Sequence, residues 1–357
     1  MIVCGREYDD TDMTIPRSKD TITINDIARM AGVSKKTVSR VINNATGVSD
    51  KTRLEVKKIV KQTGFVPNPQ AQALAFRRSF LVGLIYDNPS PQYIVNIQRG
   101  VLEALKGTRY QLVLRPCDRS DPDYHDQVLS FVQQHNPFGL IFVPSVSEDT
   151  ELSTKLKDKN CHFVRIASVN LEDPAHQIQT ADSQGAKLAA RHLAELGHTK
   201  IAHIHGPELF MSTHERRAGF KAGLEDFGLT LAPKWTVEGA YTFDSGVECA
   251  ARLLQREDRP TAIFAGNDEM AVGVYFAARQ AGLRIPQDLS VIGFDDTPIV
   301  SRISPPMTVV RSPIRDVGSD AAHLLIRSDK LDPENSPAIP QTIELDFITR
   351  ASTCAPK

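Results

Sequence analysis

Lysine and arginine side chains near the start of the chain have the chemistry needed to hydrogen-bond with nucleic-acid bases. Lys35 and Lys36 are followed about one helical turn later by Arg40. Donation from Lys or Arg to O6 and N7 of guanine is the commonest base-specific contact between protein and DNA. This cluster could therefore read base edges, provided that the surrounding chain can hold it against a groove of the duplex.

The residues around the cluster predict two short helices joined by a tight turn. Gly32 offers the backbone freedom that such a turn needs, and Ser34 can cap the helix that follows. Apolar residues have the spacing of a buried helix face on both sides of the turn, at Ile24, Ile27 and Ala28 and then at Val38, Val41 and Ile42. Such a helix-turn-helix places its second helix in the major groove, so we expect Lys35, Lys36 and Arg40 to contact bases.

A third helix is predicted after Ser49, which can cap its first turn. Lysine and arginine residues remain for its outer side, and its expected apolar positions are Leu54, Val56, Ile59 and Val60. Pro67 and Pro69 then interrupt the pattern before a short apolar run at 71–75.

This stretch resembles the lactose-repressor (LacI/GalR) family of transcription regulators. The matching segments are 24–28, 31–34, 37–43, 48–49, 51–53, 64–65 and 67–68, and the resemblance extends over about residues 21–352. It implies phosphate contacts, which set the register on DNA without reading sequence, from Thr23, Ser34, Thr37, Ser39, Asn43, Ser49 and Thr52. The same hydroxyls could instead cap helices, and Ser34 and Ser49 could do both.

The resemblance also implies that residues 67–79 form a hinge containing a short helix on DNA. Leu74 would then wedge into a central base step from the minor groove, with Asn68 and Gln72 as further minor-groove residues. An apolar wedge unstacks the bases but bends the duplex and creates more contact. The alternative is a linker helix that packs on the protein's own core.

After the hinge, strand-like and helix-like segments alternate, which predicts α/β structure with parallel sheets covered by helices. Strands are expected at 81–86, 111–115, 139–144, 162–167, 200–205, 237–241, 262–265, 289–294, 308–311 and 342–348. Helices are expected at 93–106, 123–134, 151–157, 182–196, 213–227, 245–255, 270–280 and 315–326. With the resemblance, this gives an all-α helix-turn-helix domain followed by a two-lobed core like that of periplasmic binding proteins.

The expected domains follow from these patterns. They are a disordered tail (1–20), a helix-turn-helix domain (21–66), the hinge (67–79), a core (80–352) and a short tail (353–357). Within the core, we expect one lobe at about 80–179 plus 312–340 and the other at about 180–311 plus 341–352.

Polar residues follow three of the expected strands, at the carboxyl ends where open α/β sheets bind ligands. The candidates are Asp87, Asn267 and Asp295, while Asp268 could instead cap a helix and Asp296 could brace its loop. The resemblance adds Arg216 as the effector-binding arginine and Tyr241 as an aromatic platform. Together these side chains suit the hydroxyls and C–H face of a sugar. Some sugar-binding relatives differ at two positions, with an acidic residue in place of Ser168 and an aromatic one in place of Ile314.

Charge is unevenly distributed along the chain. Its net charge is −1, yet residues 21–80 carry 11 Lys and Arg against 3 Asp and Glu. A basic head on an acidic body is typical of a nucleic-acid-binding module attached to another function. The expected partners are pseudo-palindromic double-stranded operator DNA, a small-molecule effector such as a sugar, and a second copy of the chain in a homodimer.

Other functional classes find little support in the sequence. No apolar run approaches the ~20 residues that span a bilayer, the N-terminus lacks the apolar segment of a secretory signal, and the five cysteines show no paired spacing. A cytoplasmic protein is therefore expected, rather than a solute-binding protein of a transporter. Common nucleotide-binding, metalloprotease and hydrolase motifs are absent, so we expect no enzyme, cofactor or metal site. His203 and His205 are interpreted as core or solvated residues.

Overall fold

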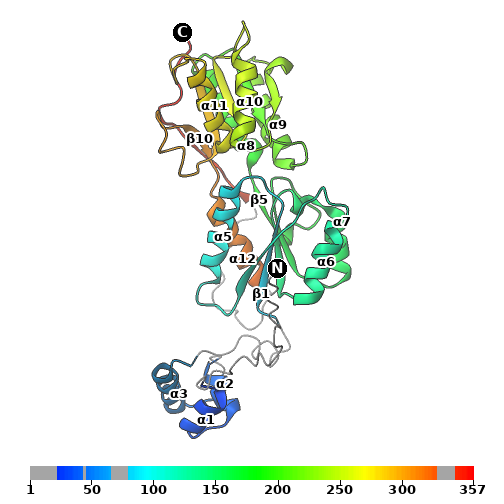
Figure 1. The fold of residues 1–357 in the computed structure, drawn as a ribbon, viewed down its shortest axis with the longest axis vertical. Helices are drawn as coiled ribbons and strands as arrows, with labels where there is room; N and C mark the ends of the chain where they lie inside the picture. The colour runs from blue at the N-terminus through cyan, green and yellow to red at the C-terminus, as the bar shows by residue number, and fades with distance from the viewer. Residues whose placement is uncertain (1–21, 43–45, 66–78, 328–341) are drawn as a thin grey trace, which may run out of the picture. The chain divides into compact units, whose positions relative to one another are not determined.

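The computed structural model describes residues 22–42, 46–65, 79–327 and 342–357. The chain divides into two compact units, Met1–Arg78 and Ser79–Lys357 (Figure 1). None of the helices in these ranges combines the length and the apolar character that crossing a membrane requires.

The first unit contains the predicted helix-turn-helix. Its helices α1 (Ile24–Met30), α2 (Lys35–Ile42) and α3 (Asp50–Thr63) pack around a core of Ile27, Ala28, Val38, Val41, Val56 and Ile59. Gly32 makes the turn between α1 and α2 with a φ of +63°. The two predicted caps are confirmed, because Ser34 Oγ accepts from the Thr37 N–H at 3.1 Å and Ser49 Oγ accepts from the Thr52 N–H at 3.3 Å.

One predicted core position of α3 is wrong. Leu54 is 70% exposed, whereas Val56 is fully buried. Two residues along a helix correspond to about 200° of rotation, so Leu54 and Val56 cannot share the inner face. The buried face continues from Val56 through Ile59, at the expected spacing of three residues.

The second unit contains two six-stranded sheets, one in each lobe. The first is parallel throughout, in the order β11-β5-β4-β3-β1-β2. Its strands are β1 (Leu81–Tyr86), β2 (Gln111–Pro116), β3 (Gly139–Phe142), β4 (Phe163–Ala167), β5 (Gln177–Thr180) and β11 (Thr342–Ile343). One face is covered by α5 (Pro91–Leu105) and α12 (Ile314–Ile326), and the other by α6 (Tyr124–His135) and α7 (Thr150–Asp158) (Figure 1).

The second sheet has the order β12-β10-β9-β8-β6-β7, with only β12 antiparallel to its neighbour. Its strands are β6 (Ile201–His205), β7 (Thr236–Glu238), β8 (Ala262–Ala265), β9 (Ser290–Asp295), β10 (Thr308–Arg311) and β12 (Asp346–Ile348). On one face, α8 (Asp182–Glu195) and α9 (Met211–Glu225) bury a core around Phe220 and Phe264. On the other, α10 (Phe243–Leu254) and α11 (Asp268–Gln280) bury a core around Ile263 and Met270.

The chain crosses between the lobes after β5, after β10 and between β11 and β12. The prediction of a single last strand at 342–348 is therefore wrong, because β11 pairs with β5 in the first sheet whereas β12 pairs with β10 in the second. Leu345, between the two short strands, is already buried in the core of the second lobe. β5 was not predicted as a strand, and β11 lies in the first sheet although residues 341–352 were expected in the other lobe.

Gly219 allows α9 to approach α8 closely. A Cβ atom at this position would lie 1.9 Å from the carbonyl oxygen of Ser183. Only glycine fits such a contact without displacing a helix. Because Arg216 lies about one turn before Gly219, the same approach brings its side chain to Asp182 at the start of α8.

Candidate functional site

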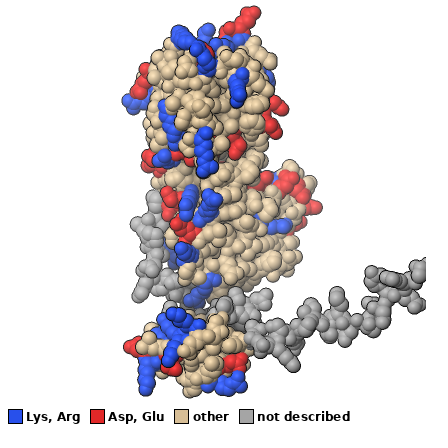
Figure 2. All heavy atoms as spheres, turned by 60° about the vertical axis from the view of Figure 1, so that its left-hand side comes forward, with Lys and Arg blue, Asp and Glu red and all other residues tan. Residues whose placement is uncertain are grey.

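The outer face of α2 carries the side chains predicted to read bases. Lys35, Lys36 and Arg40 are all exposed, while Val38 and Val41 face the core. Figure 2 shows Lys and Arg side chains standing out on the visible surface of this helical unit. A convex helix with cationic side chains and a buried opposite face has the form needed to enter a major groove.

Several predicted phosphate contacts serve as caps in the structure. Thr23, Ser34 and Ser49 each accept a hydrogen bond from a backbone N–H in the first turn of α1, α2 and α3. Thr37 and Thr52 lie 2.9 Å from the capping hydroxyls of Ser34 and Ser49. The Thr23 hydroxyl also donates to Asp26 Oδ2 at 2.7 Å, whereas the Ser34 and Ser49 hydroxyls can each donate to the neighbouring threonine or to another acceptor. Ser39 is half-buried on α2, and Asn43, Asn68, Gln72 and Leu74 lie outside the described residues.

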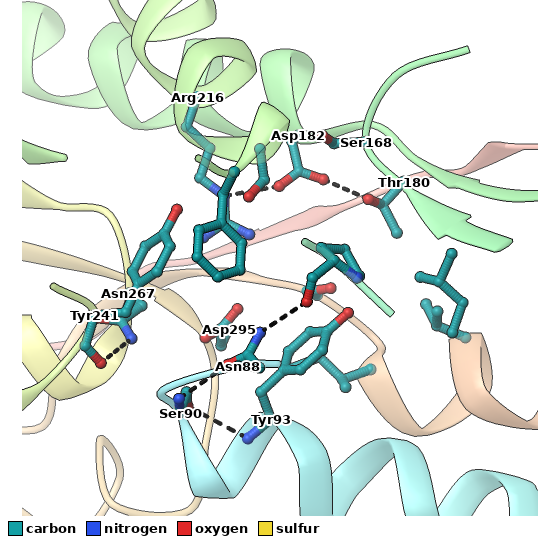
Figure 3. A pocket seen from close by; sticks show the side chains of 17 residues that line it. Asn88, Ser90, Tyr93, Ser168, Thr180, Asp182, Arg216, Tyr241, Asn267 and Asp295 are labelled. Atoms are coloured by element: carbon teal, nitrogen blue, oxygen red, sulfur yellow. Dashed lines mark hydrogen bonds and ion pairs between the residues drawn. The ribbon is translucent and has the colours of Figure 1, made fainter. Parts of the chain in front are cut away.

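A second candidate site is a small, partly open cavity between the two lobes, with a volume of about 50 Å³ (Figure 3). This space holds only a few water molecules. Both lobes contribute to its wall, which consists of Asn88, Ser90, Tyr93, Pro144, Ile166, Ser168, Thr180, Asp182, Phe210, Ser212, Arg216, Tyr241, Asn267, Asp295, Ser312, Ile314 and Val317. A ligand larger than a few waters therefore fits fully inside only if the lobes move apart.

Four of the five predicted effector residues line this cavity, namely Arg216, Tyr241, Asn267 and Asp295. Asp87 does not. Its Oδ2 accepts from the Arg119 N–H at 3.0 Å, and the neighbouring Asn88 lines the cavity instead. Because consecutive residues at a strand end point in different directions, the choice between Asp87 and Asn88 could not be made from their position after β1.

Arg216 is held from several directions. Its Nε donates to Asp182 Oδ1 at 2.7 Å, its Nη1 donates to the Gly266 carbonyl, and its Cζ lies 3.6 Å from the ring centroid of Phe294. Asp182 also accepts from the Thr180 hydroxyl. This network fixes the guanidinium at the cavity wall in one orientation. Figure 3 shows its part through Asp182 and Thr180.

Asp295 differs from Asp182 because its carboxylate accepts no hydrogen bond within the described part of the chain, although only 7% of the residue is exposed. Its backbone has a φ of +113°, which is strained for a residue with a side chain. Burial raises the pKa of Asp295 to about 7, with nearby Asp182 and Glu269 adding to this effect and Arg216 opposing it. Such a carboxylate is poised to accept hydrogen bonds from a ligand.

Asn267 and Tyr241 mainly shape the cavity wall. Asn267 Oδ1 caps α11 by accepting from the Met270 N–H at 3.0 Å, and its Nδ2 donates to the Tyr241 carbonyl at 2.9 Å. Tyr241 has a φ of +58° and its hydroxyl lies 2.8 Å from Thr213 Oγ1. Both residues are therefore positioned by bonds within the second lobe, and both line the cavity.

Asp268 and Asp296, for which the sequence left more than one role open, both make hydrogen bonds or ion pairs within the protein. Asp268 does not cap α11, since Asn267 does, and its Oδ2 accepts from the Thr297 N–H at 2.6 Å. Asp296 braces its loop through ion pairs with Arg311 at 2.7 Å and Arg350 at 2.6 Å. Asp182, which the sequence did not single out, lines the cavity, and so does Ser168, one of the two positions at which some sugar-binding relatives differ.

The two histidines of β6 belong to the interior. His203 stacks on Phe264 at 4.9 Å between ring centroids, and burial lowers its pKa to about 3. His205 is 6% exposed and hydrogen-bonds with the Gly206 carbonyl. Across the described residues, no group of three or more His, Cys, Asp or Glu is arranged to hold a metal ion.

Comparison with known proteins gives the same two-part organisation. The family model of bacterial regulatory proteins of the lacI family matches residues 23–68, and that of the periplasmic binding protein-like domain matches residues 190–353. Catabolite control protein A of Priestia megaterium is 34% identical over 308 residues, which cover 86% of this chain and 92% of that protein.

Two further relatives are similar over most of the chain. The ribose operon repressor of Escherichia coli K12 is 31% identical, covering 85% of this chain and 92% of that protein. The crystal structure of the lac repressor dimer bound to operator and the anti-inducer ONPF is 28% identical, with a TM-score of 0.78, and covers 94% of this chain and all of that one. Identity above 30% over most of both chains means that this protein belongs to the lacI family of bacterial regulatory proteins.

Proposed function

We propose that this protein is a sequence-specific DNA-binding repressor whose affinity for operator DNA is controlled by a sugar bound between the lobes of its core. The observation that carries the proposal is the presence of two sites in one chain. Lys35, Lys36 and Arg40 lie exposed on the second helix of a helix-turn-helix. Arg216 and Asp295 line the cavity between the two lobes of the core.

The relatives support both halves of the proposal. One solved relative is a repressor dimer on operator DNA, and another relative is named for ribose. By analogy, this chain acts in the cytoplasm as a homodimer that presents two heads to a pseudo-palindromic operator. No cofactor, membrane partner or chemical turnover forms part of this function.

Regulation follows from the small volume of the cavity between the lobes. A sugar can enter only while the lobes are apart and is retained when they close, so binding selects one lobe arrangement. If the two arrangements hold the heads of a dimer differently, the effector changes operator affinity. Which arrangement suits the operator decides whether the sugar releases the repressor or strengthens its binding.

The test begins with selection of operator duplexes from a random DNA pool by the full-length protein. Thermal-shift screening of neutral sugars then identifies ligands, since a ligand at 100 times its Kd adds about 2.7 kcal/mol to stability. Fluorescence anisotropy should show that such a ligand changes operator affinity. A ligand that saturates the core but leaves operator affinity unchanged would refute the proposed control, and turnover of the bound sugar would point to an enzyme.

A further inference from the structure

The outer side of α3 carries a basic surface that the base-reading residues of α2 do not explain. Leu54, Lys57, Lys58 and Lys61 have the three- and four-residue spacing that places side chains on one side of a helix. All four are exposed. Among the described residues, none of these three lysines forms an ion pair. We name these four residues the lysine face.

The lysine face and the reading face of α2 point in different directions. Both helices bury their inner sides in one core, α2 through Val38 and Val41 and α3 through Val56 and Ile59. Because the outer sides of two such helices point away from their shared core, they diverge. A duplex that receives α2 in its major groove therefore leaves the lysine face without a partner.

Residues 7–12 carry the complementary charge. Four acids, Glu7, Asp9, Asp10 and Asp12, lie within these six residues with no basic residue among them, and Tyr8 adds an aromatic ring. This acidic stretch belongs to the predicted tail (1–20), which lies outside the described residues and outside the 23–68 match to the lacI family model. Runs of like charge outside a folded domain are often interaction segments. The carboxylates suit the lysines, and the ring of Tyr8 suits the exposed Leu54.

The acidic stretch is attached close enough to reach this surface. Ile22, the first described residue, packs against the core of the helical unit. Asp12 precedes Ile22 by ten residues, and an extended chain of that length spans up to about 35 Å. With its 14 residues, α3 is about 21 Å long. A segment tethered at this range has an effective concentration of the order of millimolar, so several ion pairs that are weak one by one can hold it.

We propose that the acidic stretch 7–12 docks on the lysine face of α3 and keeps this face from binding DNA non-specifically. Non-specific binding comes almost entirely from contacts between cationic side chains and phosphates, and any exposed basic surface can supply them. The docked stretch neutralises the lysine face but leaves Lys35, Lys36 and Arg40 on α2 free for the major groove. Binding through the wrong side of the head is thereby suppressed. This docking involves neither the sugar nor the operator sequence, so it stands independently of the proposed regulation.

Zero-length crosslinking of the full-length protein tests the docking directly. A carbodiimide joins a carboxylate to an ammonium group in contact with it, and peptide mass spectrometry identifies the pair. At about 50 mM salt, we expect links from residues 7–12 to the lysine face in the single-chain species, and their loss at 1 M salt, where the Debye length is about 3 Å. A link between Lys51 and Glu55, one helical turn apart, is the positive control. Residues 7–12 linked only to Lys35 or Lys36, or to no lysine of the head, would overturn the docking on α3.

The effect on DNA binding is measured with a duplex of scrambled sequence. At about 50 mM salt, E7Q/D9N/D10N/D12N should bind this duplex at least threefold more tightly than wild type, because the lysine face is uncovered. The matched control, E225Q/D226N/D244N/E248Q, removes four exposed acids of the core and should leave the affinity within twofold of wild type. An equal increase in the control would mean that net charge alone is responsible. An unchanged affinity in the first variant would refute the proposed suppression.

Substitution of the lysines separates docking from direct contact with DNA. K57Q/K58Q/K61Q removes the charge of the lysine face and keeps the buried side of α3. In this background, the four changes in residues 7–12 should no longer alter affinity for the scrambled duplex; an effect as large as in the wild-type background would place the acidic stretch elsewhere. On the selected operator at about 150 mM salt, where the Debye length is about 8 Å, K57Q/K58Q/K61Q should change affinity less than twofold. A larger loss would make operator phosphates, and not the acidic stretch, the partner of this face.

Discussion

At the scale of single residues, Asp295 combines burial, backbone strain and an unpartnered carboxylate. None of these features stabilises the fold. Residues with such a combination are found at binding sites because a ligand supplies what the protein leaves unsatisfied. Asp268 differs in that its Oδ2 accepts from both the backbone and the hydroxyl of Thr297, although its Oδ1 is buried without a hydrogen-bond partner in the described structure.

A pH-dependent contribution to stability follows for Asp295. Its pKa rises from 3.8 to about 7 on folding, so the folded protein binds this proton more tightly than the unfolded chain. The contribution is fully present below about pH 4 and is lost as the pH rises through about 7. Asp295→Asn should therefore be more stable than wild type at pH 8, and this difference should shrink towards pH 5. Urea unfolding at pH 5, 6.5 and 8 measures it, and parallel pH profiles for the two proteins would contradict it.

Base reading is also a property of single residues. Lys35→Ala should cost about 1–3 kcal/mol on the preferred operator and relax the preference at one base pair. Lys61→Ala, at the exposed end of α3, serves as control and should leave base preference unchanged. Affinities for a set of single-base operator variants give the answer. If K35A weakens binding equally on all of them, Lys35 contacts phosphate instead.

At the scale of elements, the packing of α8 against α9 fixes the geometry of the cavity. Gly219→Ala adds a methyl group whose carbon would lie 1.9 Å from the Ser183 carbonyl oxygen if neither helix moved. We expect α9 to shift, with a loss of about 1–3 kcal/mol in unfolding free energy and a larger relative loss of sugar affinity. Ala222→Ser, at an exposed position of the same helix, should change neither quantity appreciably. Calorimetry and urea unfolding measure both, and unchanged sugar binding in G219A would show that Arg216 does not depend on this contact.

A second element-scale feature joins the lobes directly. Glu148, in the short helix η1 (Val146–Glu148) after β3, accepts from the Met211 N–H at the start of α9 at 3.1 Å. Burial raises the pKa of Glu148 to about 7; the Met211 hydrogen bond and Arg119 oppose this, and Asp182 adds to it. Separation of the lobes returns the carboxyl to water, so its pKa falls back towards 4.5. Closure therefore takes up a proton between about pH 4.5 and 7.

The consequence is that lower pH favours closed lobes. Sugar affinity in the wild type should increase as the pH falls from 8 to 5.5, and Glu148→Gln should reduce this dependence. Both proteins still contain Asp295, so the difference between their profiles isolates Glu148. Glu151→Gln, an exposed acid on α7, is the control and should follow the wild type. An E148Q profile as steep as that of the wild type would exclude Glu148 from closure.

The elements also show what sequence alone could predict. The bounds of β1, β8 and β10 were predicted to the residue, because apolar residues lie at the centre of each of these strands. β5 was missed because Gln-Ile-Gln-Thr has a single aliphatic residue. β11 and β12 were predicted as one strand. Their separation depends on which sheet each of them pairs with, and the local sequence does not contain that information. Asp182 was missed for the same reason, since the packing of α8 against α9 brings it to Arg216.

At the scale of the whole molecule, the proposed function requires that ligand binding to the core unit change the free energy of DNA binding by the head unit. Coupling between two binding sites is reciprocal. If the effector changes the affinity for operator DNA by a given factor, operator DNA changes the affinity for the effector by the same factor. For a typical coupling of about 1–3 kcal/mol, this factor is about 5–150. The cavity carries one end of this coupling through Arg216 and Asp295, and α2 carries the other through Lys35 and Arg40.

Both affinities can be measured on full-length protein, with anisotropy for a labelled operator and calorimetry for the sugar. We expect the two factors to agree within error, and expect Lys35→Ala to leave sugar affinity without DNA unchanged. Asp295→Asn should retain wild-type operator affinity in the absence of sugar, because Asp295 lies in the core unit and not in the head. Its operator affinity should no longer respond to sugar at concentrations that saturate the wild type. The two factors could agree while the operator affinity of D295N still responds fully to sugar. That result would mean that the controlling ligand binds somewhere other than this cavity.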